Sequence, residues 1–534
     1  MSLRRLVVII ALLPAIISYA TLPTSPPYRN PEHATFIFDN STRIDVNLLD
    51  MFVTNHGSFA YWISCYAHGL MYPTGTIHHL AKSAGLWIGA LVDGDTTVTV
   101  ASLTTEYSPG PMVDGSYNPN YIDPHYRVYS IDYNSGPGDP DWDEWPSEEG
   151  APLNELGEPL LLADRTLWCV YNDADSSRHT TEPGETAPLG VEIQNTVFAF
   201  DSTEAFGYVI FMKYLIINKG SNYLDDTYVA FWCDADIGNG ADDLVGCDLD
   251  YWVGYSYNAT NNDPFYGSAP PCLGFDVLQG PIVPSQGDTA TVSGTPYPNY
   301  RNLPMTAFNK IINVIDPRNP KEAYWYMQGL NAVEGEGAPY WNPINGQYTT
   351  YPFDGDPVTV TGWIDDWPGQ RKFLLASGPF DLEPTTAHSD SIILGITAQE
   401  IWMAVIVGHG TDRLSSITEM RANSAAAQEF FDNTTFTSVP ICEPKIPDDF
   451  TLHQNYPNPF NSTTIIPFEI TSPRRVTLTI FNLLGQKVTT LLDENISAGF
   501  HHMSWNALQL PSSIYLYRLQ TSNFTSTKKM VFLK

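Results

Sequence analysis

Basic residues are scarce in this chain, which has 26 Lys and Arg against 59 Asp and Glu and a formal net charge of −33. The deficit lies in residues 21–450, where 17 basic residues face 56 acidic ones, whereas residues 451–534 carry seven basic and three acidic residues. Residues 21–450, called the body below, are so acidic that they repel the phosphate backbone of nucleic acids, and nucleic acid is not expected as a partner. The acidic residues either attract cations or remain solvated.

Long apolar runs are lacking beyond the N-terminus. The segment "MSLRR" is followed by an apolar run of thirteen, "LVVIIALLPAIIS", and by the small residues Ser18 and Ala20. This pattern predicts a signal peptide over residues 1–20, cleaved after Ala20 and read by the Sec machinery. The run is short for a membrane span and contains Pro14. No later segment approaches eighteen uninterrupted apolar residues, so we expect no transmembrane segment in the mature chain.

Known catalytic motifs are absent from the sequence. It has no Gly-x-Ser-x-Gly elbow, His-Glu-x-x-His helix, Walker loop, dinucleotide fingerprint or Cys-x-x-Cys pair. The pairs His78-His79 and His501-His502 attract attention, but neighbours on a strand point to opposite faces and do not readily share a metal. We therefore assign no catalytic residue and no cofactor-binding motif.

Cysteines are few. The six residues at positions 65, 169, 233, 247, 272 and 442 allow three disulfides in an oxidising compartment, among fifteen pairings. Cys233 and Cys247 are the best local candidates, because a bridge between them would close a loop of about fifteen residues. The alternative is that these cysteines are buried free thiols.

What the sequence does contain is typical of an all-β protein. Its 42 prolines and 38 glycines punctuate many short β-rich runs, and Asp93-Gly94 between two such runs predicts a hairpin. One helix is expected near residues 411–432, capped by Thr411 or Asp412. We predict a multi-domain chain of antiparallel β-sandwiches. Its regions are a signal peptide (1–20), an N-terminal β-rich region (21–145), a central β-sandwich region ending in the helix (146–436), a Pro-rich linker (437–450) and a C-terminal domain (451–534).

The segment "CDADIGNGADDLVGCDLD" is the best candidate for a metal site. Its carboxylates lie within one glycine-containing loop, and calcium prefers six to eight oxygen ligands from a flexible backbone. The candidate ligands are Asp234, Asp236, Asp242, Asp243 and Asp248. The loop does not match an EF-hand. Alternatively, these carboxylates cap turns and face solvent.

Two pairs of tryptophans lie among acidic residues, Trp142 with Trp145 and Trp363 with Trp367. They could stack on sugar rings, although burial in a sandwich is the commoner role of such residues. A pair of carboxylates that could hydrolyse sugars is neither assigned nor excluded, because the 59 acidic residues allow too many combinations for any one pair to be chosen.

The segment "QNYPNPFNSTT" follows the Pro-rich linker and combines prolines, which fix their own φ angles, with asparagines that can cap turns. Short alternating runs follow it, such as "TTIIPFEI" and "RVTLTIFN". They predict six or seven strands in 84 residues, as in a small immunoglobulin-like sandwich.

With the blocks "VTLTIFNLLGQKVTTLL", "SAGFHHMSWNA", "LPSSIYLYRLQ" and "KKMVFLK", this tail resembles the type A C-terminal sorting domain of the type IX secretion system. The body more weakly resembles uncharacterised secreted proteins that carry the same tail. The residues that carry the sorting-domain motif are Asn455, Tyr456, Pro457, Asn458, Pro459, Phe460, Asn461, Gly485, Gln486, Gly499, Trp505, Tyr515 and Lys529.

The resemblance implies an export route and a set of partners. The cargo would cross the inner membrane through Sec, fold in the periplasm and be recognised by the type IX translocon. A sortase would then cut in the linker, often joining the cargo to anionic lipopolysaccharide. We therefore expect a secreted or cell-surface protein, with a non-catalytic body in a structural, adhesive or binding role. The alternative is an extracellular polysaccharide hydrolase or a carbohydrate-binding protein.

Overall fold

The computed structural model describes residues 40–65, 67–312, 316–332, 337–436, 450–455, 458–470, 473–482, 486–496, 499–508, 510–521 and 525–534. The predicted signal peptide, nearly all of the predicted linker, Cys442 and the motif residues Tyr456, Pro457 and Gly485 lie outside these residues.

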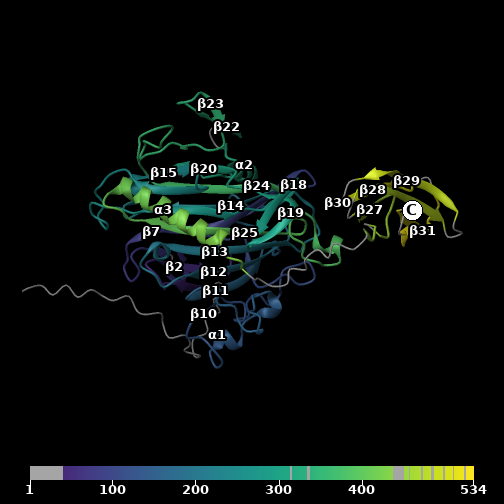
Figure 1. The fold of residues 1–534 in the computed structure, drawn as a ribbon, viewed down its shortest axis with the longest axis horizontal. Helices are drawn as coiled ribbons and strands as arrows, with labels where there is room; N and C mark the ends of the chain where they lie inside the picture. Colours follow the sequence, from purple (N-terminus) through teal and green to yellow (C-terminus); the bar gives the residue numbers. More distant parts are fainter. Residues whose placement is uncertain are drawn as a thin grey trace, which may run out of the picture.

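The body is built on two sheets (Figure 1). The first sheet has the order β1-β2-β3-β7-β14-β24-β20, with β6 paired to β2 and β7 and with β8 paired to β7. Its strands are β1 (Ser41–Ile44), β2 (Asp50–Thr54), β3 (Ser58–Phe59), β6 (Leu70–Met71), β7 (His79–Val92), β8 (Asp95–Thr99), β14 (Leu224–Ala235), β20 (Ala307–Ile312) and β24 (Arg371–Leu382).

The second sheet has the order β10-β11-β12-β13-β25-β17-β16-β15, with β9 paired to β11. Its strands are β9 (Ser108–Pro109), β10 (Tyr129–Asp132), β11 (Arg165–Asn172), β12 (Val191–Ala199), β13 (Val209–Asn218), β15 (Asp243–Asp248), β16 (Val253–Asn258), β17 (Cys272–Gln279) and β25 (Ala398–Gly408). Strands from both predicted body regions therefore share both sheets.

Short elements surround the two sheets. They are β4 (Tyr61–Trp62), η1 (Ile63–Cys65), β5 (Ala67–His68), α1 (Pro140–Asp143), η2 (Ser147–Glu149), η3 (Ala205–Tyr208), η4 (Gly240–Asp242), β18 (Ile282–Val292), β19 (Thr295–Asn302), α2 (Pro320–Met327), β21 (Leu330–Asn331), β22 (Ala338–Asn342), β23 (Gln347–Thr349), η5 (Thr385–His388) and α3 (Arg413–Asp432).

The two sheets pack face to face through aromatic side chains. Phe275 of β17 contacts Phe59 of β3 and Phe373 of β24, with ring centroids 5.6 and 5.3 Å apart. Tyr214 of β13 contacts Phe231 of β14 in the same way, at 5.3 Å. Because strand side chains alternate between faces, each of these strands sends every second residue into this shared core.

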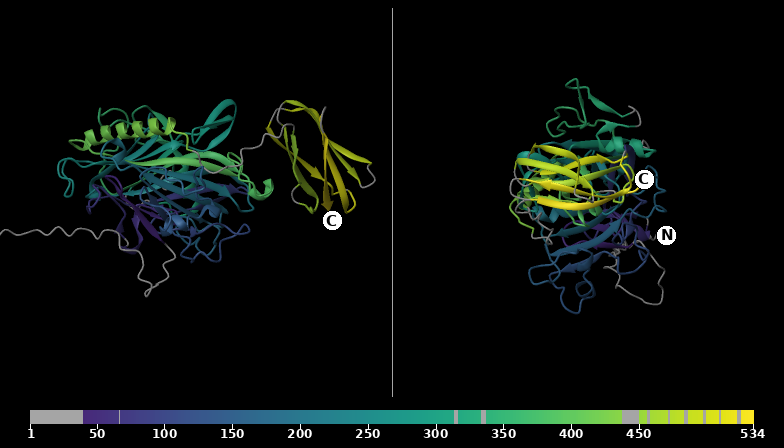
Figure 2. Two further views of the ribbon diagram at one scale, coloured as in Figure 1. Left: turned by 60° about the horizontal axis from the view of Figure 1, so that its bottom comes forward. Right: turned by 90° about the vertical axis from the view of Figure 1, so that its right-hand side faces the viewer.

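The middle strands are also covered on their outer faces. In β25, Ile401 and Met403 face the core between the sheets, whereas Trp402 faces outward and packs on Phe431 of α3. In β14, Trp232 faces outward into a second apolar cluster under α2. A strand buried on both faces needs a nearly continuous apolar sequence, which explains the run "IWMAVIVG". The result is a sandwich whose second sheet is covered by α3, the long helix along one side of the body in Figure 2, and whose first sheet is covered by α2.

The long helix α3 forms where the sequence predicted it. The Asp412 side chain accepts hydrogen bonds from the backbone N–H groups of Leu414 and Ser415, and the Ser415 hydroxyl oxygen accepts one from the Asp412 N–H. This capping box satisfies N–H groups that have no partner inside the helix. Ile417 and Met420 lie buried against the second sheet.

The predicted all-β, antiparallel fold is confirmed. At the predicted hairpin, β7 and β8 are joined by Asp93 and Gly94 alone, with φ of 51° and 87°. Two positive φ angles match the twist of a two-residue hairpin, and Gly and Asp tolerate them. No helix among the described residues is both long and apolar enough to cross a membrane.

The C-terminal residues form a separate two-sheet sandwich (Figure 1). One sheet has the order β26-β27-β30, and its strands are β26 (Phe450–Leu452), β27 (Thr463–Ile470) and β30 (Gly499–Asn506). The other has the order β29-β28-β31-β32, and its strands are β28 (Arg474–Asn482), β29 (Lys487–Ile496), β31 (Ser513–Gln520) and β32 (Thr525–Phe532). The alternating residues Ile466, Phe468, Val476 and Leu478 fill a core of its own.

The predicted Cys233–Cys247 disulfide is wrong, because both residues are free thiols. They lie on β14 and β15, which belong to different sheets, and both side chains pack in the core between the sheets. Burial raises the pKa of both thiols well above its ordinary value. The open alternative of buried thiols is therefore the correct one for this pair.

One buried carboxyl group should make the stability of the body depend on pH. Asp276 of β17 accepts a hydrogen bond from Ser424 of α3 at 2.6 Å, and burial raises its pKa to about 7. In the unfolded chain it titrates near pH 4. The folded state therefore favours the protonated acid, and stability falls as the pH rises from about 4 to about 7.

We expect Asp276→Asn to remove this loss of stability with rising pH and to raise the free energy of unfolding at pH 8 by on the order of 3 kcal/mol. Denaturant unfolding at pH 4.5 and pH 8 measures it. Asp288→Asn is the control, because Asp288 also accepts a bond from a serine, Ser285, but lies exposed. Equal pH dependence in the wild type and Asp276→Asn would contradict the assignment.

Candidate functional sites

The asparagines of the "NYPNPFN" segment hold it against the last strands of the tail. Asn455 is buried, its backbone N–H donates to the Tyr517 hydroxyl at 2.9 Å, and its side chain donates to Thr464 Oγ1 at 2.9 Å. The Tyr517 hydroxyl in turn donates to the carbonyl of His453. These bonds satisfy buried polar groups that would otherwise destabilise the fold.

Asn458 and Phe460 fix the same segment to β32. The Val531 N–H donates to Asn458 Oδ1 at 2.7 Å, and Phe460 exchanges backbone hydrogen bonds with Val531 and Leu533. The Phe460 ring is buried against Trp505 and Phe532. The motif is therefore part of the sandwich rather than a free lead-in to it.

The remaining described motif residues have local roles. Tyr515 is buried against Trp505, and its hydroxyl donates to the carbonyl of Pro511. The Gln486 N–H donates to Asn482 Oδ1, which connects the end of β28 to the residue before β29. Asn461 and Lys529 are exposed, Gly499 begins β30, and Pro459 follows Asn458 through a cis peptide bond.

The structure separates the five aspartates predicted to bind calcium. Asp234 lies on β14, where burial raises its pKa to about 6 against the opposing charges of Lys372 and Lys82. Asp248 forms an ion pair with Arg421 of α3, with 2.7 Å between its Oδ2 and the arginine Nε. These two carboxylates thus have cationic partners of their own.

Asp236, Asp242 and Asp243 lie closer together, around η4. Asp243 is buried, and its Oδ2 accepts a hydrogen bond from the Ile237 N–H at 3.2 Å. Its Oδ1 and the Oδ1 of Asn258 are buried without a hydrogen-bond partner. Burial, followed by the charges of Asp236 and Asp242, raises the Asp243 pKa well above its ordinary value.

The structure also brings Asp236 to two histidines, His68 and His79, which sequence reasoning did not connect. Burial lowers the pKa of His79, and the charge of His68 lowers it further. Burial alone would raise the Asp236 pKa, but the hydrogen bond and charge of His68 bring it below its ordinary value. His78 is not one of these three residues; its ring lies against Phe265 and Tyr266, and Phe265 also contacts the ring of His79.

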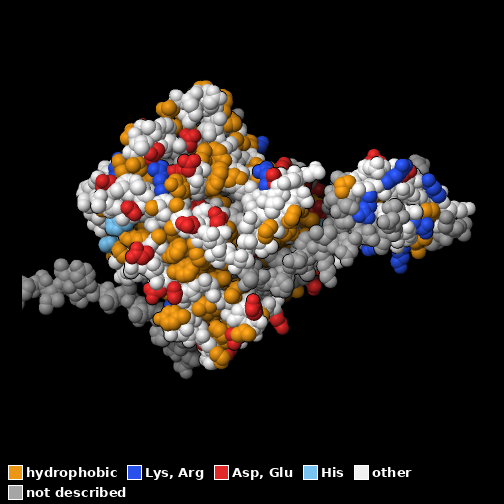
Figure 3. Space-filling model, in the orientation of Figure 1, with side chains coloured by type: hydrophobic (Ala, Val, Ile, Leu, Met, Phe, Trp, Pro, Cys, Tyr) orange, Lys and Arg blue, Asp and Glu red, His pale blue; other side chains and the backbone are white. Residues whose placement is uncertain are grey.

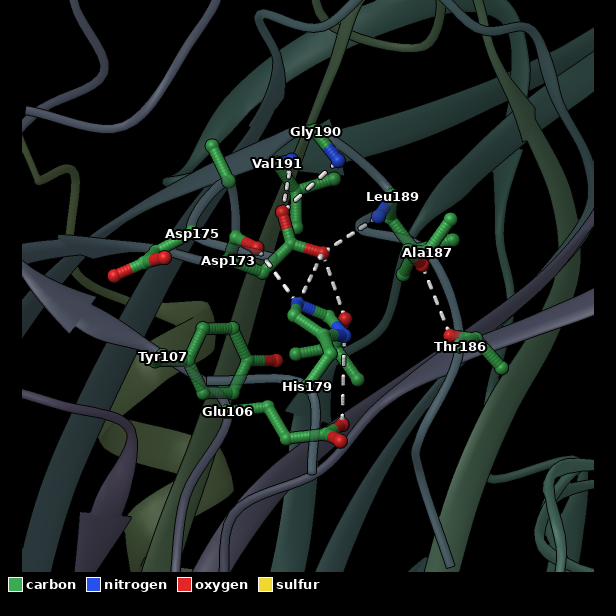
Figure 4. A network of polar contacts seen from close by, with 12 residues as sticks. Glu106, Tyr107, Asp173, Asp175, His179, Thr186, Ala187, Leu189, Gly190 and Val191 are labelled. Carbon is green, nitrogen blue, oxygen red and sulfur yellow. Dashed lines mark hydrogen bonds and ion pairs between the residues drawn. The ribbon is translucent and has the colours of Figure 1, made fainter. Parts of the chain in front are cut away.

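Another histidine, His179, lies in a buried polar network between the sheets (Figure 4). The Nε2 of His179 donates to the backbone carbonyl of Asp173 at 2.7 Å, and its Nδ1 lies 3.8 Å from Oε2 of Glu106. Glu106 accepts from the N–H groups of Val100 and Glu185, and burial raises its pKa.

Asp173 is the centre of this network. Its Oδ1 accepts from the N–H groups of Gly190 and Val191, and its Oδ2 accepts from the Leu189 N–H and the Thr99 hydroxyl (Figure 4). Thr99 belongs to the first sheet, whereas the loop that carries Asp173 joins β11 to β12 of the second. The side chains of Glu106, Asp173 and His179 are almost completely buried, so the network ties the sheets together rather than meeting a substrate.

The tryptophans differ in exposure. Trp145 is buried and donates to the carbonyl of Pro152, Trp142 packs beside it, and Trp363 packs edge-on against Phe353. Trp367 alone of the four predicted tryptophans is strongly exposed, at 73%. For the other three, the burial alternative is therefore the correct one.

An exposed aromatic pair on β22 and β23 escaped sequence reasoning. Trp341 and Tyr348 are 54% and 68% exposed, with ring centroids 5.2 Å apart and ring planes at 72°. Trp341 and Tyr348 are cross-strand partners, and β22 and β23 project above the body (Figure 1). The alternation in "APYWNPINGQYTT" was the available signal for this hairpin.

The surface charge follows the division seen in the sequence. Lys and Arg side chains gather on the tail sandwich, whereas Asp and Glu are spread over the face of the body in view (Figure 3). The two parts therefore present opposite charge to a partner.

Comparison with known proteins identifies the tail. Residues 454–533 match the family described as the secretion system C-terminal sorting domain. This part of the chain is a type IX sorting domain, and the protein is exported to the cell surface or the extracellular space. No curated protein matches the chain.

Solved structures show only distant likenesses. A polysaccharide lyase has a TM-score of 0.16 at 7% identity, over 64% of this chain and 34% of its own. A family GH92 inverting mannosidase from Bacteroides thetaiotaomicron has 0.22 at 6%, over 74% and 32%. Dimeric latent PorU from Porphyromonas gingivalis has 0.15 at 9%, over 91% and 32%. The chain thus spans about a third of their length, and these scores support no argument about the body.

We expect Asp173→Asn to destabilise the body by about 3 kcal/mol. Each carboxylate oxygen of Asp173 accepts two hydrogen bonds, and the amide nitrogen that replaces one of these oxygens in asparagine accepts none. Asp175→Asn is the control, since Asp175 accepts its bonds from Ser177 through Oδ1 alone, which Asn retains. Denaturant unfolding of both variants checks the result. Equal stabilities would show that the network does not join the sheets.

Proposed function

We propose that the protein is a type IX secretion cargo whose body binds a partner outside the cell and has no catalytic centre. The sorting domain supplies the route, with the translocon and sortase as partners. Sortase cleavage in residues 437–450 would release the body or join it to anionic lipopolysaccharide. The exposed pair Trp341 and Tyr348 is the observation that carries the binding role.

The aromatic pair favours a binding surface for a physical reason. Two large apolar rings held in water on a projecting hairpin gain free energy when a partner covers them. Their planes meet at 72°, so they form a corner that can contact a sugar chain from two sides. Polysaccharide is therefore the ligand class that we propose, and binding rather than hydrolysis is the proposed role.

Calcium remains a proposal for the loop around η4. Asp242, Asp243 and Asn258 are the residues that would hold it, because the two unpartnered buried oxygens belong to this group. The ion would have a structural role, fixing the start of β15 against the end of β16.

The export proposal is tested by deleting residues 451–534. Because the tail has its own core, the shortened body should fold but remain in the periplasm of a bacterium with a type IX system. Cell fractionation measures this, with Trp341→Ala as an exported control that retains the tail. Efficient appearance of the shortened body outside the cell would contradict the proposal.

The binding proposal is tested on a glycan array, together with a screen for released reducing ends. The mature protein should bind polysaccharide without cleaving it, and Trp341→Ala/Tyr348→Ala should bind about tenfold more weakly or worse. Tyr133→Ala is the control, because Tyr133 is an exposed aromatic outside this hairpin. Glycan cleavage would show that the body is an enzyme instead.

A further inference from the structure

His68, His79 and Asp236 are brought together from three separate segments. His68 ends β5, His79 begins β7, and Asp236 directly follows β14. Backbone hydrogen bonds from Asp236 N–H to the Leu80 carbonyl and from Gly238 N–H to the His79 carbonyl fix the loop after β14 beside β7. The first sheet therefore holds Asp236 beside His79, and His68 reaches them from the separate pair of strands β4 and β5.

The geometry suits a shared ion. The Nε2 of His68 lies 2.5 Å from Oδ2 of Asp236, and the rings of His68 and His79 stack with centroids 4.0 Å apart. One ligand atom from each of the three residues lies within 4.8 Å of the others. Ligand atoms about 2 Å from one metal ion lie roughly 3 to 4 Å from each other, so small side-chain shifts suffice.

The chain around Asp236 packs closely against its carboxylate. A Cβ added at Gly240 would lie 2.0 Å from Asp236 Oδ1, so the backbone approaches this oxygen directly. Close partners of this kind fix the orientation of a metal ligand. The His68 and Asp236 side chains are 30% and 28% exposed, which leaves the site open to ions from solvent.

We propose that His68, His79 and Asp236 bind a divalent transition-metal ion, with Zn²⁺ as the representative. Two imidazoles and one carboxylate suit Zn²⁺ and its neighbours in the periodic table, whereas calcium prefers oxygen ligands alone. The bound ion would join β5 and the loop after β14 to the start of β7. Its remaining coordination position would hold water.

The test is calorimetric titration of Zn²⁺ into the metal-free protein that lacks only the predicted signal peptide (residues 21–534), prepared without a histidine tag. The wild type should bind one equivalent at this site, and Zn²⁺ should raise its melting temperature. His68→Gln should weaken this binding by more than about 100-fold and abolish the thermal shift, since it removes a direct ligand. Because the His68 side chain is partly exposed, the variant should keep the body folded, and circular dichroism verifies the fold.

His78→Gln is the matched control, because it removes the adjacent histidine, whose ring lies against Phe265 and Tyr266. This variant should bind Zn²⁺ like the wild type. Visible absorption of bound Co²⁺ gives a second readout. The absorption bands of Co²⁺ bound at this site should disappear in His68→Gln and in Asp236→Asn. Absence of binding in the wild type, or equal binding in His68→Gln, would overturn the site.

Discussion

The burial of aromatic and aliphatic side chains between two large sheets is the constraint on which the body depends. Phe231, Phe275 and Phe373 can leave water only if both sheets are present, so neither sheet is a complete unit alone. Since the middle strands are also apolar on their outer faces, the helices α2 and α3 must cover them. The chain from β1 to α3 therefore packs as one layered structure.

That close contact explains where polar groups occur. Inside the sandwich, Asp173 and His179 are tolerated because each meets backbone partners, and the bond from the Thr99 hydroxyl to Asp173 links the two sheets. At the end of β14, where the core gives way to solvent, Asp236 meets His68 and His79 in a partly open position. The first cluster stabilises the fold, whereas the second is placed where ions can reach it.

The C-terminal sandwich is also stabilised by burial and by hydrogen bonds, although it is small. The "NYPNPFN" segment contributes to it in two ways: Asn455 donates and Asn458 accepts a hydrogen bond, and the Phe460 side chain is buried. The residues that mark the family are thus largely those that build the domain. An export machine that reads this domain reads a folded surface, on which the exposed basic side chains contrast with the acidic body.

The sequence was sufficient to predict the strand-rich class, the Asp93-Gly94 hairpin, the capped helix and the sorting domain, because each depends on neighbouring residues or on a local pattern. It could not establish the thiol state of Cys233 and Cys247, since that depends on which sheet each strand joins. Nor could it connect His68 with Asp236, 168 positions away, or separate Asp248 from the other aspartates of its loop. These contacts follow from the three-dimensional fold, because strand pairing across long sequence separations sets which side chains meet.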